Sequence, residues 1–294
     1  KKYMVGRTDF YIDTTVAFDD WVAEFEKERG LLLPLHLPLK CPPKDWVKNG
    51  KGAYYTPRME IPFIKAKKGD ARRFVEEHTP KQHMKAVSKL QRTAWRINNR
   101  VLKVQEEIFQ RNLGVGIPSS QPLKATPFPE HLTEVPREEL THPQKEEVNA
   151  WKMLRKSEHV KEMERKGQVI GFRQSHLLAQ ELRDWEKFYF AYNCDFRGRI
   201  YCATAGLSPQ GADGAKGLLQ FATGVKLGTS GLKWLAIHGA NTFGEDKLTY
   251  VDRVAWIKSN EDLIRGIVED PISNTQWSEA DKPYQFLAFC YEWA

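Results

Sequence analysis

The segment FAYNCDFRGRIY, from Phe190 to Tyr201, carries the clearest strand and turn pattern in the chain. Aromatic and β-branched residues on either side predict two short strands, over residues 188–192 and 200–203. Gly198 lies between them and permits a tight turn or the close approach of another backbone. A strand–turn–strand unit in a chain whose other segments are mostly helical predicts a mostly helical α+β fold.

The predicted turn carries one carboxylate and two guanidinium groups within five residues. Arg197 and Arg199 alternate with Gly198, so in an extended chain both side chains can point to the same side. Two planar donors on one side suit phosphate oxygens, and Asp195 could orient one arginine or bind a ribose hydroxyl. The same residues also fit a salt-bridge cluster at a strand end, and the pattern leaves both interpretations open.

Helical periodicity dominates much of the remaining chain. Apolar residues at three- and four-residue spacing predict one helix over residues 81–110. Charged segments predict a helix over 144–166, interrupted at Gly167 and Gly171, and a second one over about 175–187. A Pro-rich connector precedes them. A separate basic stretch fits either a solvated face or a nucleic-acid contact, and consists of Lys65, Lys67, Lys68, Arg72 and Arg73.

The composition narrows the class of protein. The 294 residues include 45 Lys plus Arg and 38 Asp plus Glu, a formal charge of +7, with 41% hydrophobic and 28% charged residues. These values exclude collagen-like, low-complexity and wholly disordered chains. No run approaches the roughly 20 apolar residues that cross a bilayer. The four scattered cysteines lack zinc-site spacing and favour a reducing compartment. The missing initiator Met and the apolar, periodic residues 286–294 predict a fragment of a longer protein.

The stretch from Phe190 to Tyr201 resembles the template-binding motif of the bacteriophage and mitochondrial single-subunit DNA-directed RNA polymerases. The resemblance is collinear over nearly the whole chain. It rests on further blocks at Pro42–Trp46, Thr93–Asn98, Pro209–Gly211, Lys216–Leu219, Trp234–Asn241 and Phe286–Glu292. The blocks at 209–211 and 238–241 resemble the phage branch more than the mitochondrial one.

This resemblance implies part of a right-handed polymerase. Residues 1–90 would form the end of the N-terminal, promoter-side domain. Residues 91–187 would form the helical thumb region, and residues 188–294 the first part of the palm with its inserted helices.

The resemblance also implies a set of nucleic-acid contacts. Arg197 and Arg199 would bind phosphates of the template and the RNA–DNA hybrid, on a surface shaped by Asp195 and Tyr201. Two lysines would face nucleic acid or the incoming nucleotide, namely Lys216 and Lys247. Val5 would lie at the tip of a hairpin that wedges open the promoter, although a Val-Gly turn also fits an ordinary loop.

The family joins nucleotides with Mg²⁺ ions held by paired aspartates. The resemblance places those aspartates beyond Ala294, so this chain is expected to contain no catalytic or metal-binding residue and to be inactive alone. The implied partners are promoter and template DNA, RNA product and nucleoside triphosphates, with no accessory subunit and no membrane. A monomer in the cytoplasm of an infected bacterium is expected, rather than a mitochondrial protein. The alternative is a polymerase-derived nucleic-acid-binding protein without catalytic activity.

Overall fold

The structure, a computed structural model, describes residues 15–17, 20, 35–47, 50–65, 77–78, 81–117, 119–136 and 138–294. The chain divides into two compact units, residues 1–32 and 33–294. In the first unit, residues 16, 17 and 20 are helical. The second unit carries the elements considered below.

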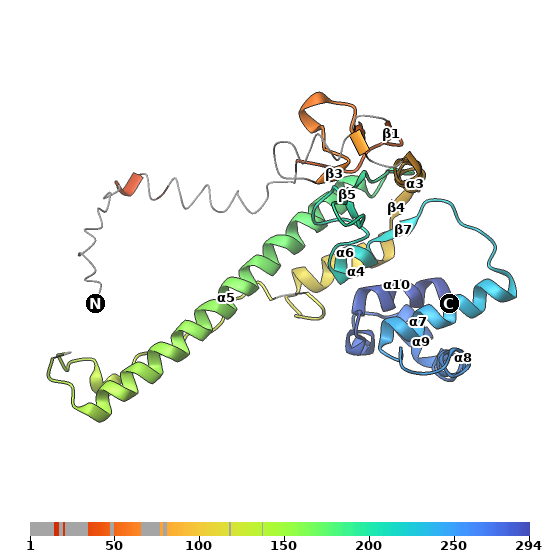
Figure 1. Cartoon of the computed structure of the whole chain (residues 1–294). Helices are drawn as coiled ribbons and strands as arrows, with labels where there is room; N and C mark the ends of the chain where they lie inside the picture. Colours follow the sequence, from red (N-terminus) through yellow and green to blue (C-terminus); the bar gives the residue numbers. More distant parts are fainter. Residues whose placement is uncertain are drawn as a thin grey trace. The chain divides into compact units, whose positions relative to one another are not determined.

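The strands in the described part of the second unit form three small sheets (Figure 1). The motif strands β5 and β6 form an antiparallel pair, and β3 adds to β5 in parallel orientation. The other sheets are the antiparallel pairs β1–β2 and β4–β7. The bounds are β1 Lys44–Val47, β2 Lys51–Ala53, β3 Ile64–Lys65, β4 Trp95–Ile97, β5 Tyr192–Asp195, β6 Ile200–Cys202 and β7 Leu219–Phe221.

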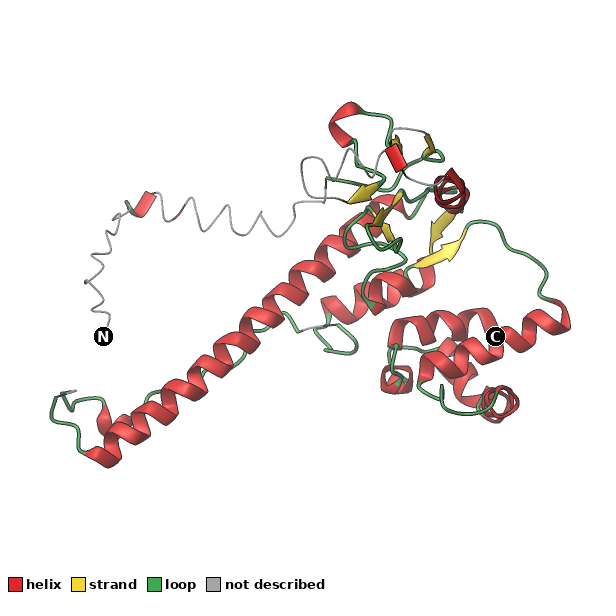
Figure 2. Ribbon diagram, in the orientation of Figure 1, coloured by secondary structure: helices red, strands yellow, loops and turns green. Residues whose placement is uncertain are grey.

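Helices contain far more of the described residues than strands do (Figure 2), which confirms the predicted mostly helical α+β fold. Their bounds are α3 Lys81–Gln91, α4 Asn99–Gln110, α5 His142–Leu182, α6 Asp213–Gly217, α7 Gly228–Phe243, α8 Tyr250–Ser259, α9 Glu261–Glu269 and α10 Pro283–Trp293. Three short 3₁₀ turns occur at Pro57–Met59, Glu130–Leu132 and Thr275–Glu279. None of the helices in the described part of the chain combines the length and the apolar character needed to cross a membrane.

The prediction of one helix over residues 81–110 is wrong in its middle, where β4 separates α3 from α4. The backbone N–H and C=O of Trp95 bond to Phe188 at 2.9 and 2.8 Å, and β4 also pairs with β7. Asn98 then starts α4, because its side chain accepts a hydrogen bond from the N–H of Val101. Backbone bonds across the sheets thus replace the helical bonds that the periodicity predicted.

The predicted interruption at Gly167 and Gly171 is also wrong, since both lie inside the continuous helix α5. A glycine inside a helix costs only about 1 kcal/mol relative to alanine. Strong helix formers on both sides outweigh this cost. The predicted strand over 188–192 forms only single bridges at Phe188 and Tyr189 before β5 begins.

A connector along α5, residues 119–126, is held to this helix by hydrogen bonds. The N–H of Leu123 donates to Glu162 at 3.0 Å, and the N–H of Thr126 donates to Glu158 at 3.1 Å. The guanidinium of Arg165 donates to the carbonyl of Ser119 at 2.6 Å. These contacts satisfy backbone groups that would otherwise rely on water, so the connector follows the helix rather than forming a separate loop.

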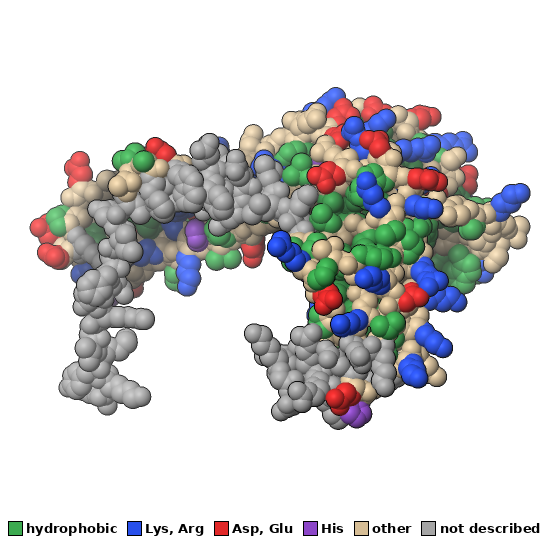
Figure 3. All heavy atoms as spheres, turned by 90° about the horizontal axis from the view of Figure 1, so that it is seen from above, with side chains coloured by type: hydrophobic (Ala, Val, Ile, Leu, Met, Phe, Trp, Pro, Cys, Tyr) green, Lys and Arg blue, Asp and Glu red, His purple; other side chains and the backbone are tan. Residues whose placement is uncertain are grey.

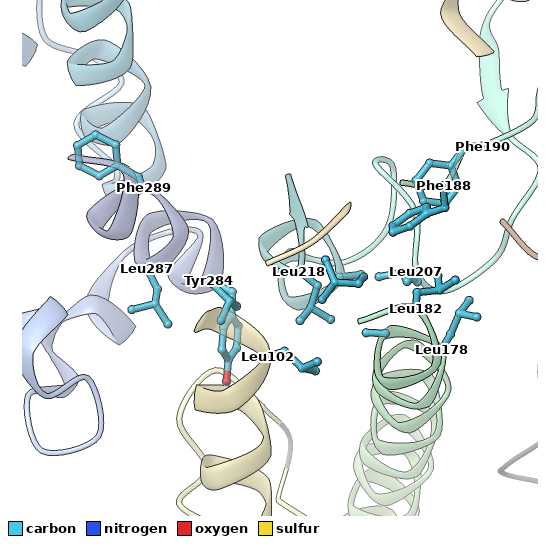
Figure 4. Close-up of a cluster of buried hydrophobic side chains, with 14 of the residues drawn as sticks. Leu102, Leu178, Leu182, Phe188, Phe190, Leu207, Leu218, Tyr284, Leu287 and Phe289 are labelled. Atoms are coloured by element: carbon cyan, nitrogen blue, oxygen red, sulfur yellow. The ribbon is translucent and has the colours of Figure 1, made fainter. Parts of the chain in front are cut away.

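The main hydrophobic core joins the motif strand to the C-terminal helices. Helix α10 lies against α4, α6, α7 and α9. Figure 4 shows part of this core, to which α10 contributes Tyr284, Leu287 and Phe289. Phe188 and Phe190, which precede β5, are fully buried in the same core. The strand that carries the charged turn is therefore anchored in the main hydrophobic core.

Candidate nucleic-acid interface

The charged turn connects β5 to β6 and is closed by its own backbone. The N–H of Asp195 donates to the carbonyl of Arg199 at 2.8 Å, and the N–H of Gly198 donates to the carbonyl of Asp195 at 3.0 Å. Gly198 has a φ of 80°, a left-handed conformation that favours glycine, and a Cβ at this position would meet open space. The glycine is thus required by the backbone of the turn rather than by crowding.

Asp195 holds both arginines of the turn in place. Its Oδ1 accepts the N–H groups of Arg197 and Arg199 at 2.8 and 2.9 Å. Its Oδ2 accepts the Nε of Arg199 at 2.9 Å and lies 3.7 Å from the Nε of Arg197. Partial burial of the carboxylate opposes its charged form, but the hydrogen bonds from Arg199 and Arg197 outweigh this effect and keep the pKa of Asp195 below its usual value.

Both arginines remain exposed although they are anchored. The exposed fractions of the side chains are 62% for Arg197 and 55% for Arg199, against 14% for Asp195. The contacts with Asp195 involve the Nε atoms, and neither guanidinium forms an ion pair with any other described residue. Arg197 also lies over the ring of Phe196, 5.1 Å from its centre, and this ring is 73% exposed. The sequence left two alternatives open, a salt-bridge cluster and a pair of arginines available to phosphate oxygens. The structure shows the salt bridges to Asp195, and it also leaves both guanidiniums exposed to solvent.

The sheet brings two further side chains to this surface. Tyr201 on β6 is partly buried and pairs with Asn193 of β5. Lys65 on β3 lies opposite Asp195, and its Nζ is 5.7 Å from the centre of the Tyr201 ring. The sequence placed Lys65 in a basic stretch without linking it to the motif. The link between Lys65 and the motif depends on the parallel pairing of β3 with β5. No pattern near Lys65 in the sequence indicates this pairing.

The structure does not bring the other predicted contact residues to this turn. Lys216 on α6 lines a cavity of about 600 Å³ together with Trp95, His238 and Phe289. Lys247 follows α7, has a side chain 90% exposed and pairs with Asp246 at 3.2 Å. No hydrogen bond or ion pair among the described residues connects either lysine to the motif. Val5 lies outside the described residues.

The face seen in Figure 3 shows no single basic patch among the described residues. Lys and Arg side chains are interspersed with Asp and Glu over the face seen in Figure 3. Among the residues that the structure describes, no group of three or more His, Cys, Asp or Glu side chains could hold a metal ion.

Comparison with known proteins identifies relatives over most of the chain. The family model for DNA-dependent RNA polymerase matches residues 225–294. The DNA-directed RNA polymerase of Enterobacteria phage K11 is 34% identical over 267 residues, which cover 89% of this chain and 28% of the phage protein. T7 RNA polymerase of Escherichia phage T7 is 32% identical over 301 residues, which cover 99% of this chain and 32% of the relative. This chain is a relative of the single-subunit RNA polymerases.

The mitochondrial polymerases are equally similar to the chain. The mitochondrial DNA-directed RNA polymerase of Neurospora crassa is 35% identical over 271 residues, covering 89% of this chain and 18% of that protein. These identities confirm the resemblance inferred from the motif blocks, and the relatives include both phage and mitochondrial polymerases. The chain spans about a third or less of the length of these polymerases.

Proposed function

We propose that this chain is the central part of a single-subunit DNA-directed RNA polymerase that transcribes duplex DNA from a promoter. Three features support the proposal: the collinear similarity to such polymerases, the exposed arginine pair and its rigid anchoring by Asp195. In this assignment, residues 1–90 belong to the N-terminal domain, residues 91–187 to the thumb and residues 188–294 to the palm.

The observation that carries the functional assignment is the geometry of the turn. The Arg199 guanidinium is held by a hydrogen bond from its Nε to Asp195, and the Arg197 guanidinium lies 3.7 Å from the same carboxylate, so both lose less side-chain freedom on binding a phosphate than unpaired arginines would. Phosphate contacts of this kind position a nucleic acid without reading its sequence. We assign the arginines to the template strand and the RNA–DNA hybrid, with Asp195 and Tyr201 supporting them.

The remaining assignments follow the family resemblance. Lys216 and Lys247 would contact nucleic acid or the incoming nucleotide, and Val5 would assist promoter opening. The catalytic Mg²⁺ ions would bind carboxylates outside this chain, which alone would not polymerise nucleotides. The partners would be DNA, RNA and nucleoside triphosphates, for a monomer without accessory subunits acting in the cytoplasm of an infected bacterium.

Binding measurements on the 294-residue chain test the assignment of the arginines. A labelled oligodeoxythymidylate is titrated at several salt concentrations by fluorescence anisotropy. Replacing Arg199→Gln is expected to weaken binding and to reduce the slope of log K against log salt by about 0.7, the value for one phosphate contact with a single strand. Arg265→Gln on α9 is the matched control, because this arginine is 67% exposed and also pairs with nearby carboxylates.

Two outcomes would count against this assignment. Equal slopes for the Arg199 and Arg265 variants would show that Arg199 binds no phosphate. A lower melting temperature with unchanged nucleic-acid affinity would favour the salt-bridge cluster instead. Templated RNA synthesis by the product of an extended reading frame distinguishes the polymerase from the alternative, a polymerase-derived binding protein without catalytic activity.

A further inference from the structure

Strand β3 adds a residue from a distant part of the sequence to the charged turn. The N–H of Cys194 donates to the carbonyl of Phe63 at 2.7 Å, and the side-chain amide of Asn193 donates to the carbonyl of Pro62 at 3.4 Å. The register places Lys65 directly opposite Asp195. Directly paired residues of neighbouring strands point to the same face of a sheet, so Lys65 and Asp195 share one face.

Tyr201 lies on this same face, because it pairs with Asn193, two residues before Asp195 on β5. The ammonium group of Lys65 lies 5.7 Å from the centre of the Tyr201 ring, within the range of a cation–π contact. Lys65 is exposed and forms no ion pair with any described residue. The ring therefore restricts the lysine side chain without neutralising its charge.

The charges of this face do not cancel. Asp195 forms an ion pair with both Arg197 and Arg199. Lys65 adds a third cation from a neighbouring strand. One carboxylate and three cations leave a net charge of about +2, on a surface where Gly198 leaves the turn open. Arginine binds a phosphate through a planar pair of donors, whereas lysine acts as a point charge that adapts to a neighbouring phosphate.

We infer that Lys65 is a further phosphate-binding residue of this interface and that Tyr201 is the residue that positions it. The ligand is the sugar-phosphate backbone of a nucleic acid strand, which would contact β3 as well as the β5–β6 turn. This inference rests on the proposed function, since it assigns a third cation to the same site. It also assigns Tyr201 a specific role, namely to hold the lysine rather than to contact the ligand.

The test uses the 294-residue chain and the same labelled oligodeoxythymidylate. Lys65→Gln is expected to reduce the magnitude of the negative slope of log K against log salt by about 0.7. A fourfold rise in salt concentration would then weaken the binding of this variant by a factor about three times smaller than the factor for the parent chain. Lys65→Arg is expected to restore the slope. Lys258→Gln on α8, another exposed lysine, is the matched control and is expected to leave the slope unchanged.

Tyr201 variants test the positioning role. Tyr201→Phe keeps the ring and is expected to bind like the parent chain, whereas Tyr201→Leu removes the ring and is expected to reduce affinity in the parent background but not in Lys65→Gln. An equal loss in both backgrounds would overturn the positioning role. Melting curves of all variants establish that they are folded.

The outcomes separate this inference from the proposed function. A reduced slope for Arg199→Gln with an unchanged slope for Lys65→Gln would overturn the inference and leave the arginine site intact. Unchanged slopes for both variants would overturn the proposed interface itself. A reduced slope for Lys65→Gln that Lys65→Arg does not restore would show that the lysine acts through the fold, and would also overturn the inference.

Discussion

Replacing Gln91 by leucine tests whether one buried amide holds the motif strand to the preceding part of the fold. The Gln91 side chain is fully buried, and its Oε1 accepts from the Nε1 of Trp46 at 3.1 Å and from the N–H of Tyr192 at 3.0 Å. Its Nε2 donates to the carbonyl of Lys44 at 3.3 Å. A single side chain thus connects β1, α3 and β5.

The expected loss of stability follows from these bonds. In Gln91→Leu, the N–H of Tyr192 loses its acceptor, which costs about 1–3 kcal/mol in a buried position. The Nε1 of Trp46 keeps the carbonyl of Tyr192 as an acceptor at 3.0 Å, so its loss is smaller. Leucine is close to glutamine in size and gains from burial, which offsets part of the cost. The smaller Trp46 loss and the offset from leucine burial oppose each other, so the net decrease in the free energy of unfolding is expected to be about 1–3 kcal/mol.

Urea denaturation followed by far-UV circular dichroism measures this decrease. Gln110→Leu at the exposed end of α4 is the control, and it is expected to change stability by less than about 0.5 kcal/mol. A Gln91→Leu variant as stable as this control would refute the role assigned to the amide. Total stabilities are about 5–15 kcal/mol, so the expected loss is readily measured.

Two further predictions concern packing and pH. Gly239→Ala is expected to destabilise the chain by about 1–3 kcal/mol in urea denaturation, because a Cβ would overlap the ring of Phe289; a variant at least as stable as the parent would contradict this packing. The pKa values of Glu158 and Glu162 are lowered to about 2, first by hydrogen bonds from Thr126 and Arg165 respectively. Because these folded-state values lie below the usual carboxyl pKa near 4.5, the contribution to stability is complete above about pH 4.5 and is lost as the pH falls towards 2. Hydrogen-exchange protection of the connector amides is therefore expected to decrease in the parent chain as the pH falls over this interval. In the double variant Glu158→Gln, Glu162→Gln, the protection is expected to be low and nearly constant with pH. Constant protection in the parent chain would contradict the prediction.

The parts of the fold that were predicted from the sequence are those determined locally. The strand Ile200–Cys202 and most of the helical residues in α3, α4 and α5 follow from residue patterns within a few turns of chain. The break between α3 and α4 was missed because it depends on partners far along the chain, Phe188 and β7. Tertiary pairing overrides helical periodicity when it satisfies the same backbone groups.

The candidate site shows the same division. Asp195, Arg197 and Arg199 were predicted together, because five consecutive residues around a glycine can form one turn. Lys65 was not linked to them, because its position depends on the parallel pairing of β3 with β5. The sequence placed Lys65 in a basic stretch, but no neighbouring residue indicated on which surface of the fold the lysine would lie.

The bond between Trp46 and Tyr192 joins residues 146 positions apart. A ribosome that adds about 5–20 residues per second takes about 7–30 seconds to make the intervening chain. During that interval the Nε1 of Trp46 has no acceptor in β5, and β3, once it is made, has no partner strand. Formation of this contact during synthesis is thus delayed until the motif strand has left the exit tunnel of the ribosome.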